Sequence, residues 1–189
     1  MNSPIILASQ SPRRKELLTK CNIEFESVVS NYDEIIEQDL LPHNIVLKLA
    51  IGKGLDVANN YPNHTIISAD TIVVYKNHKL GKPDSYLELK QWLNSFSSNV
   101  VDTWTATVII RDGKIYAQAD IAPVQFKPLN GQMIEQYIND PEADWMDKAG
   151  GFAVQGKASQ FVEYDPKLYN IILGLNTDFV TKHIKKILT

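Results

Sequence analysis

Two arginines stand side by side where a short apolar segment ends, in the stretch LASQSPRRKELL near the N-terminus. Ser11 and Pro12 are typical of a helix N-cap and of the first helical position. Arg13 and Arg14 then fall in the first turn, where cations are unfavourable because the helix N-terminus already carries partial positive charge. Together with Ser9 and free main-chain N–H groups, they indicate an anion site, most simply for phosphate. The alternative is that both arginines are solvated or pair with acids elsewhere.

A lysine interrupts the apolar stripe of the next helical segment, NIVLKLAIGKGLDVA. Lys53 falls on the same helix face as Leu49 and Val57, at positions i−4 and i+4. It must therefore either extend to the edge of that face or point into a cleft. Gly52 and Gly54 flank it, and they permit a close approach of backbone or ligand.

Asp70 interrupts the strand-like run TIISADTIVVY. A buried carboxylate is costly unless it is paired or bound to a metal, and aspartate is a poor strand former. A bulge capped by neighbouring amides would explain it structurally. A cleft carboxylate is favoured because Lys82 follows in the tight KLGKP setting. Glu34, in SNYDEII, is a second candidate acid, and its neighbour Asp33 is more ambiguous.

A glycine-rich stretch, WMDKAGGFAVQGKAS, nearly matches a phosphate-binding P-loop. Gly151, four residues, Gly156 and Lys157 fit the pattern, but Ala158 stands where a magnesium-binding hydroxyl is required. The residues between the glycines also favour a strand. We therefore exclude a P-loop NTPase. The glycines instead predict a main chain that turns tightly and packs closely against a neighbouring segment.

The cations and acids singled out in this way suit one chemistry. They are Arg13, Arg14, Lys53, Lys82, Glu34 and Asp70. Four cations suit a polyphosphate, and two carboxylates suit a divalent metal, or a metal ligand plus a general base. Attack of water on phosphorus needs neutralised charge and an aligned nucleophile. The residues predict a metal-dependent phosphoanhydride hydrolase, without saying which bond breaks.

Composition excludes several other classes of protein. The chain has 189 residues, 44% of them hydrophobic, enough for one domain or for two lobes that share a sheet. A net charge of −3 argues against a general nucleic-acid surface. No apolar run is long enough to span a membrane or to form a signal core. One cysteine permits no internal disulfide, and the four histidines have no metal-site spacing. We expect a cytoplasmic globular protein.

The elements that must position these residues mix helices and strands along the chain, which indicates an α/β or α+β fold with a largely continuous sheet. Helices are expected at 12–20, 43–60, 86–94, 131–139 and 178–188. Strands are expected at 5–8, 24–29, 65–75, 100–111, 114–125, 152–154, 160–164 and 168–173.

Three motifs give a specific resemblance. ILASQSPRRKELL, ADTIV followed by LGKP, and MDKAGGFAVQG followed by LGLN resemble the Maf family of nucleoside triphosphate pyrophosphatases, in order and over nearly the whole chain. The resemblance implies cleavage between the α- and β-phosphates, with release of the monophosphate and pyrophosphate. It also implies an elongated mixed sheet in two lobes around a central nucleotide cleft, as one domain over residues 1–189. The resemblance further implies that the protein needs a divalent metal (Mg²⁺ or Mn²⁺) as cofactor, and a possible homodimer.

The same resemblance assigns site roles. The substrate-binding residues would be Ser9, Arg13, Arg14 and Gln155. The catalytic residues would be Asp70, Lys82, Glu34 and Lys53. Asp70 and Glu34 would be the metal ligands, with Asp70 acting either as general base or as metal ligand for the attacking water. Gln155 could contact base, sugar or phosphate.

Four short motifs indicate the substrate. SPRR, ADT, DKAG and VQG resemble the branch acting on dTTP, UTP and modified pyrimidine nucleotides. The alternatives are 7-methyl-GTP hydrolysis and a non-catalytic, nucleotide-binding regulator of cell division. Ser98, Val101 and Asn176 depart from the family pattern, the first where glycine is usual and the last where proline is usual. None belongs to the charged set, so we expect activity to survive.

Overall fold

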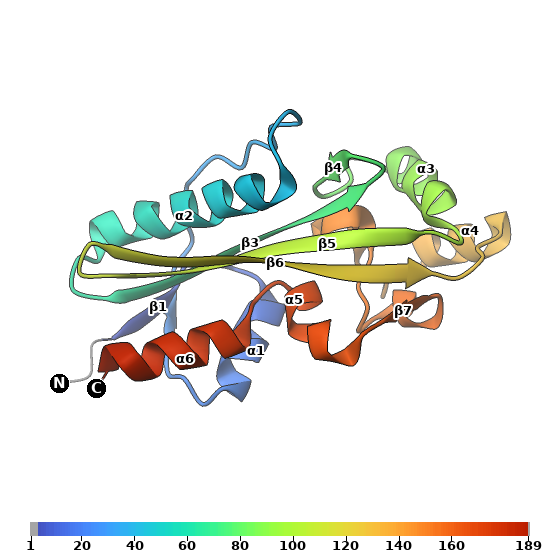
Figure 1. Cartoon of the computed structure of the whole chain (residues 1–189). Helices are drawn as coiled ribbons and strands as arrows, with labels where there is room; N and C mark the ends of the chain where they lie inside the picture. The colour runs from blue at the N-terminus through green and yellow to red at the C-terminus, as the bar shows by residue number, and fades with distance from the viewer. Residues whose placement is uncertain (1–3, 189) are drawn as a thin grey trace. The chain divides into compact units, whose positions relative to one another are not determined.

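The chain folds into a mixed α/β structure, as expected from its sequence (Figure 1). The computed structural model describes residues 4–188. The strands are β1 (Ile5–Leu7), β2 (Glu26–Ser27), β3 (Thr65–Tyr75), β4 (His78–Leu80), β5 (Val100–Arg111), β6 (Lys114–Phe126) and β7 (Val162–Tyr164). The helices are α1 (Pro12–Lys20), α2 (Pro42–Asn60), α3 (Tyr86–Phe96), α4 (Gly131–Asn139), α5 (Tyr169–Leu173) and α6 (Thr177–Leu188). Short 3₁₀ helices cover Trp145–Asp147, Ala149–Gly151, Lys157–Gln160 and Pro166–Leu168.

The strands described here form a mixed sheet in the order β2-β1-β3-β5-β6-β7, with β4 on β3. β1 runs parallel to β2 and to β3, and Ile6 lies opposite Glu26 on one side and Ile66 on the other. β4 pairs antiparallel with β3, and β7 antiparallel with β6. All three residues of β1 are buried, which explains why this strand is a continuous apolar run.

A two-residue turn joins β5 to β6. Asp112 and Gly113 both have positive φ, 49° and 72°. A two-residue hairpin favours this geometry because its twist matches that of the strands, and an Asp-Gly pair tolerates it. The turn thus places the end of β5 beside the start of β6.

The chain divides into two compact units. The first contains the described residues of Met1–Asp70, Thr105–Asp120 and Leu173–Thr189. The second contains Thr71–Trp104 and Ile121–Ile172. β3, β5 and β6 therefore each contribute residues to both units.

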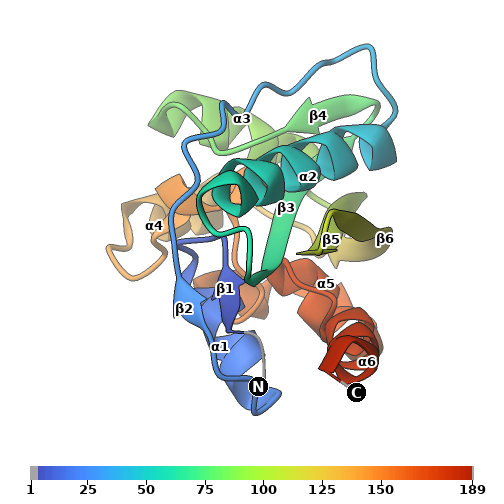
Figure 2. The same ribbon diagram turned by 90° about the vertical axis from the view of Figure 1, so that its left-hand side faces the viewer.

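In the first unit, helices cover both faces of the strands. A Cβ atom on Gly54 would lie 2.7 Å from Ser68 Oγ and 2.8 Å from Ile110 Cδ1, so α2 packs closely on β3 and β5. Figures 1 and 2 both show α2 on one side of these strands, and α1 and α6 on the other. Leu49 and Val57 are each 2% exposed, and burial of such a side chain contributes about 1.5–3 kcal/mol.

In the second unit, aromatic rings form the core. Phe126 contacts Phe96, Phe152 and Phe161 at centroid distances of 5.2, 5.1 and 5.9 Å, and the Phe126–Phe152 pair is edge-to-face. Tyr137 of α4 packs edge-to-face on Phe161 and donates its hydroxyl to the Gly151 carbonyl. None of the helices described has the length and apolar character needed to cross a membrane.

Two expected strands are wrong. Phe152–Val154 is not a strand, although all three residues are buried, because Phe152 packs into the aromatic core after two glycines with positive φ. Residues 168–173 mostly form helix α5. Short apolar runs have no periodicity that separates strand from buried helix or loop. The P-loop remains excluded by Ala158, and Lys157 pairs instead with Asp140 and Glu142.

Candidate functional site

Helix α1 begins where the sequence predicts. Ser11 is its N-cap and accepts a hydrogen bond from the Arg14 main-chain N–H at 3.5 Å, and Pro12 occupies the first turn. The Ser9 hydroxyl accepts from the Ser11 N–H at 3.2 Å. Two serine hydroxyls therefore lie beside the N-terminus of α1, where the helix dipole favours an anion.

The two arginines of this turn differ in their surroundings. Arg14 donates from Nε to the Gly174 carbonyl at 2.8 Å and from Nη1 to Ser9 Oγ at 3.4 Å. Burial lowers the pKa of Arg14, and the negative charge of Asp70 acts against that shift. Arg13 is half-buried, and within residues 4–188 its side chain makes no hydrogen bond or ion pair. Arg14 is thus fixed in place by its neighbours, while Arg13 keeps its donors for another partner.

Lys53 joins both predicted carboxylates in one cluster. Its Nζ lies 2.5 Å from Asp70 Oδ1 and 2.8 Å from Glu34 Oε1. Lys53 is 8% exposed and Asp70 4% exposed, whereas the Glu34 side chain is 54% exposed. The apolar helix face therefore holds a buried ion pair with one solvent-accessible carboxylate beside it. The buried charge of Asp70 is accounted for by its pairing with Lys53.

Burial dominates the electrostatics of Asp70. It raises the pKa of the carboxyl, while the charges of Lys53 and Arg14 and the hydrogen bond from Lys53 act to lower it, and Glu34 raises it further. Asp70 consequently accepts a proton more readily than an ordinary aspartate. A raised carboxyl pKa makes the carboxylate a stronger base, which suits a general base.

The segment that bears Glu34 is anchored on α2. The Ser30 hydroxyl and the Asn31 N–H donate to Asp56 Oδ2 at 3.0 and 2.8 Å. The ring of Tyr32 occupies the space beside Gly52, where a Cβ atom would lie 2.3 Å from Tyr32 Cζ. The sequence indicated close approach at Gly52 but not its partner, because Tyr32 is distant along the chain. This anchoring brings Glu34 to Lys53.

The second unit holds the remaining predicted residues. Lys82 and Gln155 are both exposed. The LGKP and DKAGG motifs meet there, because the Gly150 N–H donates to the Gly81 carbonyl at 2.8 Å. A Cβ atom on Gly151 would lie 2.3 Å from Leu89 Cδ1. The expected tight, closely packed glycine backbone is therefore present.

Asp70 and Glu34 are the candidate metal ligands. Among residues 4–188, no group of three or more His, Cys, Asp or Glu side chains could hold a metal ion. The two carboxylates nevertheless converge on one cation, the Lys53 ammonium. Mg²⁺ is commonly bound by one or two protein carboxylates, with substrate phosphates and waters as its other ligands. The donor set fits such an ion.

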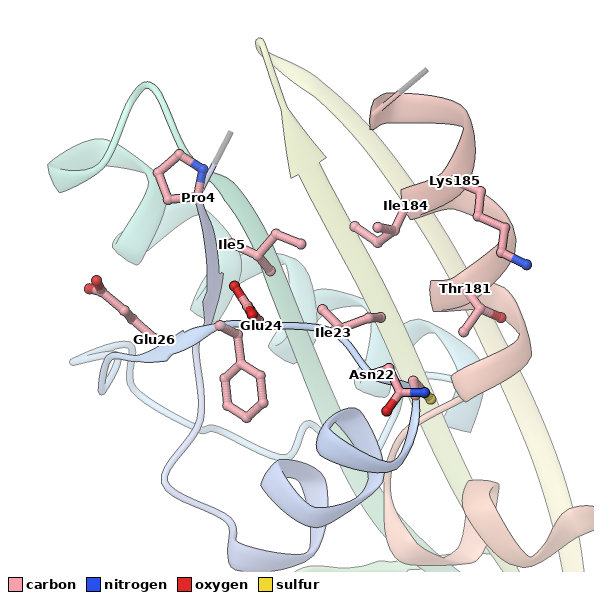
Figure 3. Close-up of a pocket in the computed structure, with 11 residues that line it drawn as sticks. Pro4, Ile5, Asn22, Ile23, Glu24, Glu26, Thr181, Ile184 and Lys185 are labelled. Carbon is pink, nitrogen blue, oxygen red and sulfur yellow. The ribbon is translucent and has the colours of Figure 1, made fainter. Parts of the chain in front are cut away.

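A hollow of about 840 Å³ lies elsewhere in the first unit (Figure 3). It is lined by residues 4 and 5, residues 21–26 and one face of α6, including Ile184 and Lys185. None of the residues predicted for the site lines it. The candidate site is therefore the charged cluster and not this hollow.

The fold and the charged cluster define a mixed α/β protein with a buried lysine–aspartate pair and an arginine-bearing helix N-terminus. The chain belongs to the Maf family, because the family profile described as Maf-like protein matches residues 4–187. The resemblance noted from the three sequence motifs is thus confirmed.

Several relatives match nearly the whole chain. A Bacillus cereus protein named dTTP/UTP pyrophosphatase is 38% identical over 182 residues, covering 96% of this chain and 89% of the relative. Proteins of the same name from Bacillus anthracis and Bacillus mycoides are 37% identical, each over 96% of this chain and 94% of the relative.

Proposed function

We propose that this protein hydrolyses nucleoside triphosphates, chiefly dTTP, UTP and modified pyrimidine nucleotides, to the monophosphate and pyrophosphate. The observation that carries the proposal is the buried pair of Lys53 and Asp70, with Glu34 beside it and Arg14 close enough to influence Asp70. The names of the relatives support the substrate class, and the SPRR, ADT, DKAG and VQG motifs agree with it.

In the proposed mechanism, Arg13, Arg14 and Ser9 bind phosphate oxygens at the start of α1 and neutralise their charge. Preorganised donors of this kind stabilise the charge that develops in phosphoryl transfer. Water attacks the α-phosphorus, so that a new P–O bond forms and the bond to the α–β bridging oxygen breaks. Pyrophosphate leaves with that oxygen.

Asp70 either takes the proton of the attacking water or binds the metal, and both roles need its carboxylate ionised. Lys53 holds Asp70 and Glu34 in place. A divalent metal, Mg²⁺ or Mn²⁺, held by Asp70 and Glu34 would supply charge neutralisation at the phosphates. Removal of the metal with a chelator should abolish turnover, and added Mg²⁺ or Mn²⁺ should restore it.

The test is pyrophosphate release from a panel of dTTP, UTP and 7-methyl-GTP, by wild type and by Asp70→Asn. We expect release from dTTP and UTP, and a loss of at least about 100-fold in the variant, the usual contribution of a general base. The matched control is Asp112→Asn, an exposed carboxylate at the hairpin tip, which should leave turnover unchanged. Release of orthophosphate alone would exclude α–β cleavage. Faster release from 7-methyl-GTP than from dTTP and UTP would identify 7-methyl-GTP as the substrate. Turnover by Asp70→Asn equal to that of wild type would favour a non-catalytic, nucleotide-binding role.

The remaining expectations concern the second unit and the assembly. We propose a catalytic role for Lys82, a substrate contact for Gln155 and a cytoplasmic homodimer, as the family resemblance implies. Lys82→Met and Gln155→Ala should each lower turnover without a change in melting temperature. Light scattering coupled to size exclusion measures the mass directly, and a monomer of 21.3 kDa would contradict the dimer.

A further inference from the structure

The segment between α5 and α6 holds the Arg14 side chain. Gly174 follows α5 directly and has a φ of 102°, a conformation that other residues rarely adopt. Its carbonyl accepts the Arg14 Nε hydrogen at 2.8 Å. Leu175, the next residue, is fully buried. The orientation of the Arg14 guanidinium thus depends on where this short segment lies.

Asn176 fixes the segment with all four of its polar groups. Its N–H donates to Thr107 Oγ1 at 2.9 Å, and its Nδ2 donates to Asp120 Oδ2 at 2.8 Å. Its Oδ1 accepts from the Phe179 N–H at 2.8 Å, and its carbonyl accepts from the Val180 N–H at 3.1 Å. One residue therefore ties the segment to β5, to β6 and to the first turn of α6.

This arrangement is particular to asparagine. In the family motif that the chain resembles, proline stands at position 176, and proline has neither an N–H nor a polar side chain. Asp120 is itself oriented, because its other oxygen accepts from Gln118 Nε2 at 2.7 Å. The departure from the family pattern therefore brings hydrogen bonds that proline cannot make.

We propose that Asn176 is a positioning residue for Arg14, acting through the main-chain carbonyl of Gly174. The inference rests on the proposed function, since it concerns how an anion-binding side chain is held. Arg14 is long and flexible, and two fixed contacts orient it before an anion arrives. Such preorganisation increases affinity because less freedom is lost on binding. A loosened segment should weaken anion binding through Arg14 specifically.

The test is calorimetric binding of inorganic triphosphate to the metal-free full chain. Asn176→Asp keeps the cap acceptor for Phe179 but places a second carboxylate against that of Asp120. We expect the affinity for triphosphate to fall by about tenfold, a coupling of usual size for residues in one network. The double variant Asn176→Asp, Asp120→Asn exchanges donor and acceptor, and should return the affinity to within about twofold of wild type. If Asn176→Asp does not fold, Asn176→Ser also keeps the cap and removes the bond to Asp120.

Two controls separate positioning from stability. Asn130 caps α4 by accepting from the Met133 N–H at 2.9 Å, so Asn130→Ala should lower the melting temperature and leave triphosphate affinity unchanged. In an Arg14→Lys background, which lacks the Nε donor, Asn176→Asp should cause no further loss of affinity.

Unchanged affinity in Asn176→Asp would overturn the inference, and so would an equal loss in the Arg14→Lys background. Absence of triphosphate binding by wild type would overturn it as well. If wild type binds triphosphate and responds to Asn176→Asp but releases no pyrophosphate from dTTP, then the proposed function fails and the positioning role stands.

Discussion

Replacing Lys53 by methionine should reveal how strongly the buried cluster is coupled. The substitution keeps an unbranched side chain, one atom shorter, and removes its charge. Asp70, at 4% exposure, would lose the ammonium 2.5 Å away. The Glu34 side chain, at 54% exposure, would turn to water. The destabilisation should therefore come almost entirely from Asp70.

The magnitude follows from the ionisation of Asp70. Removal of one partner of a buried ion pair commonly costs about 3–5 kcal/mol. The folded variant can limit this cost by protonating Asp70. With an ordinary aspartate pKa of 3.8, proton uptake at pH 7 costs about 4 kcal/mol, and at pH 5 about 2 kcal/mol. These costs are upper limits, because burial already raises the pKa of Asp70 in wild type. We expect the free energy of unfolding to fall by at most about 4 kcal/mol at pH 7 and by at most about 2 kcal/mol at pH 5.

The sign of the pH dependence can be worked out from the direction of the shift. Burial raises the pKa of Asp70 in the folded protein above its value in the unfolded chain, so the folded state binds more protons between these two values. The contribution of Asp70 to stability is fully present below its pKa in the unfolded chain, and it is lost as the pH rises through its pKa in the folded protein. Lys53→Met raises the folded pKa further, so the stability of the variant should fall more steeply with pH.

The assay is urea unfolding of wild type and variant at pH 5 and pH 7, with a chelator present. The matched control is Lys48→Met on the same helix, which removes an exposed pair with Glu37. An exposed pair contributes about 0–1 kcal/mol, so this control should change little at either pH. Equal losses in both variants, or a loss in Lys53→Met that does not depend on pH, would refute the reasoning.

Two further substitutions test the backbone. Ser98 has a φ of 61°, a left-handed conformation that strains any residue other than glycine. Ser98→Gly should therefore raise the free energy of unfolding by about 0.5–1 kcal/mol, and a lower melting temperature in the variant would contradict this strain. Gly151 has a φ of 70°, and the Leu89 Cδ1 atom lies close to the position of an added Cβ atom. Gly151→Ala should therefore lower the free energy of unfolding by about 2–4 kcal/mol. An unchanged urea midpoint would argue against tight packing at this glycine.

Where local chemistry is decisive, sequence reasoning succeeded. Helix α1 begins where Ser11 and Pro12 indicate, and the long apolar run of β3 lies where expected. It failed for Phe152–Val154, because a buried apolar run does not say whether it lies in a sheet or packs against aromatic rings.

In the candidate site too, the sequence identified individual residues but not the contacts between them. Lys53 and Asp70 were recognised because a charge on an apolar face is costly and therefore needs an explanation. Their partnership could not be deduced, since the sequence left Lys53 either at an edge or in a cleft. The sequence also did not predict that the Tyr32 ring packs against Gly52 and so anchors the segment that bears Glu34.

The sequence by itself determined which residues break the local rules, and through its motifs which family they belong to. Only the tertiary structure decided which of them meet. Arg14 and Gly174 are 160 residues apart in the chain, and Asn176 reaches Thr107 across 69 residues. Propensity and periodicity describe neighbours along the chain, whereas these contacts depend on how strands pair and helices pack. The misplaced arginine was therefore visible in the sequence, and the carbonyl that holds it was not.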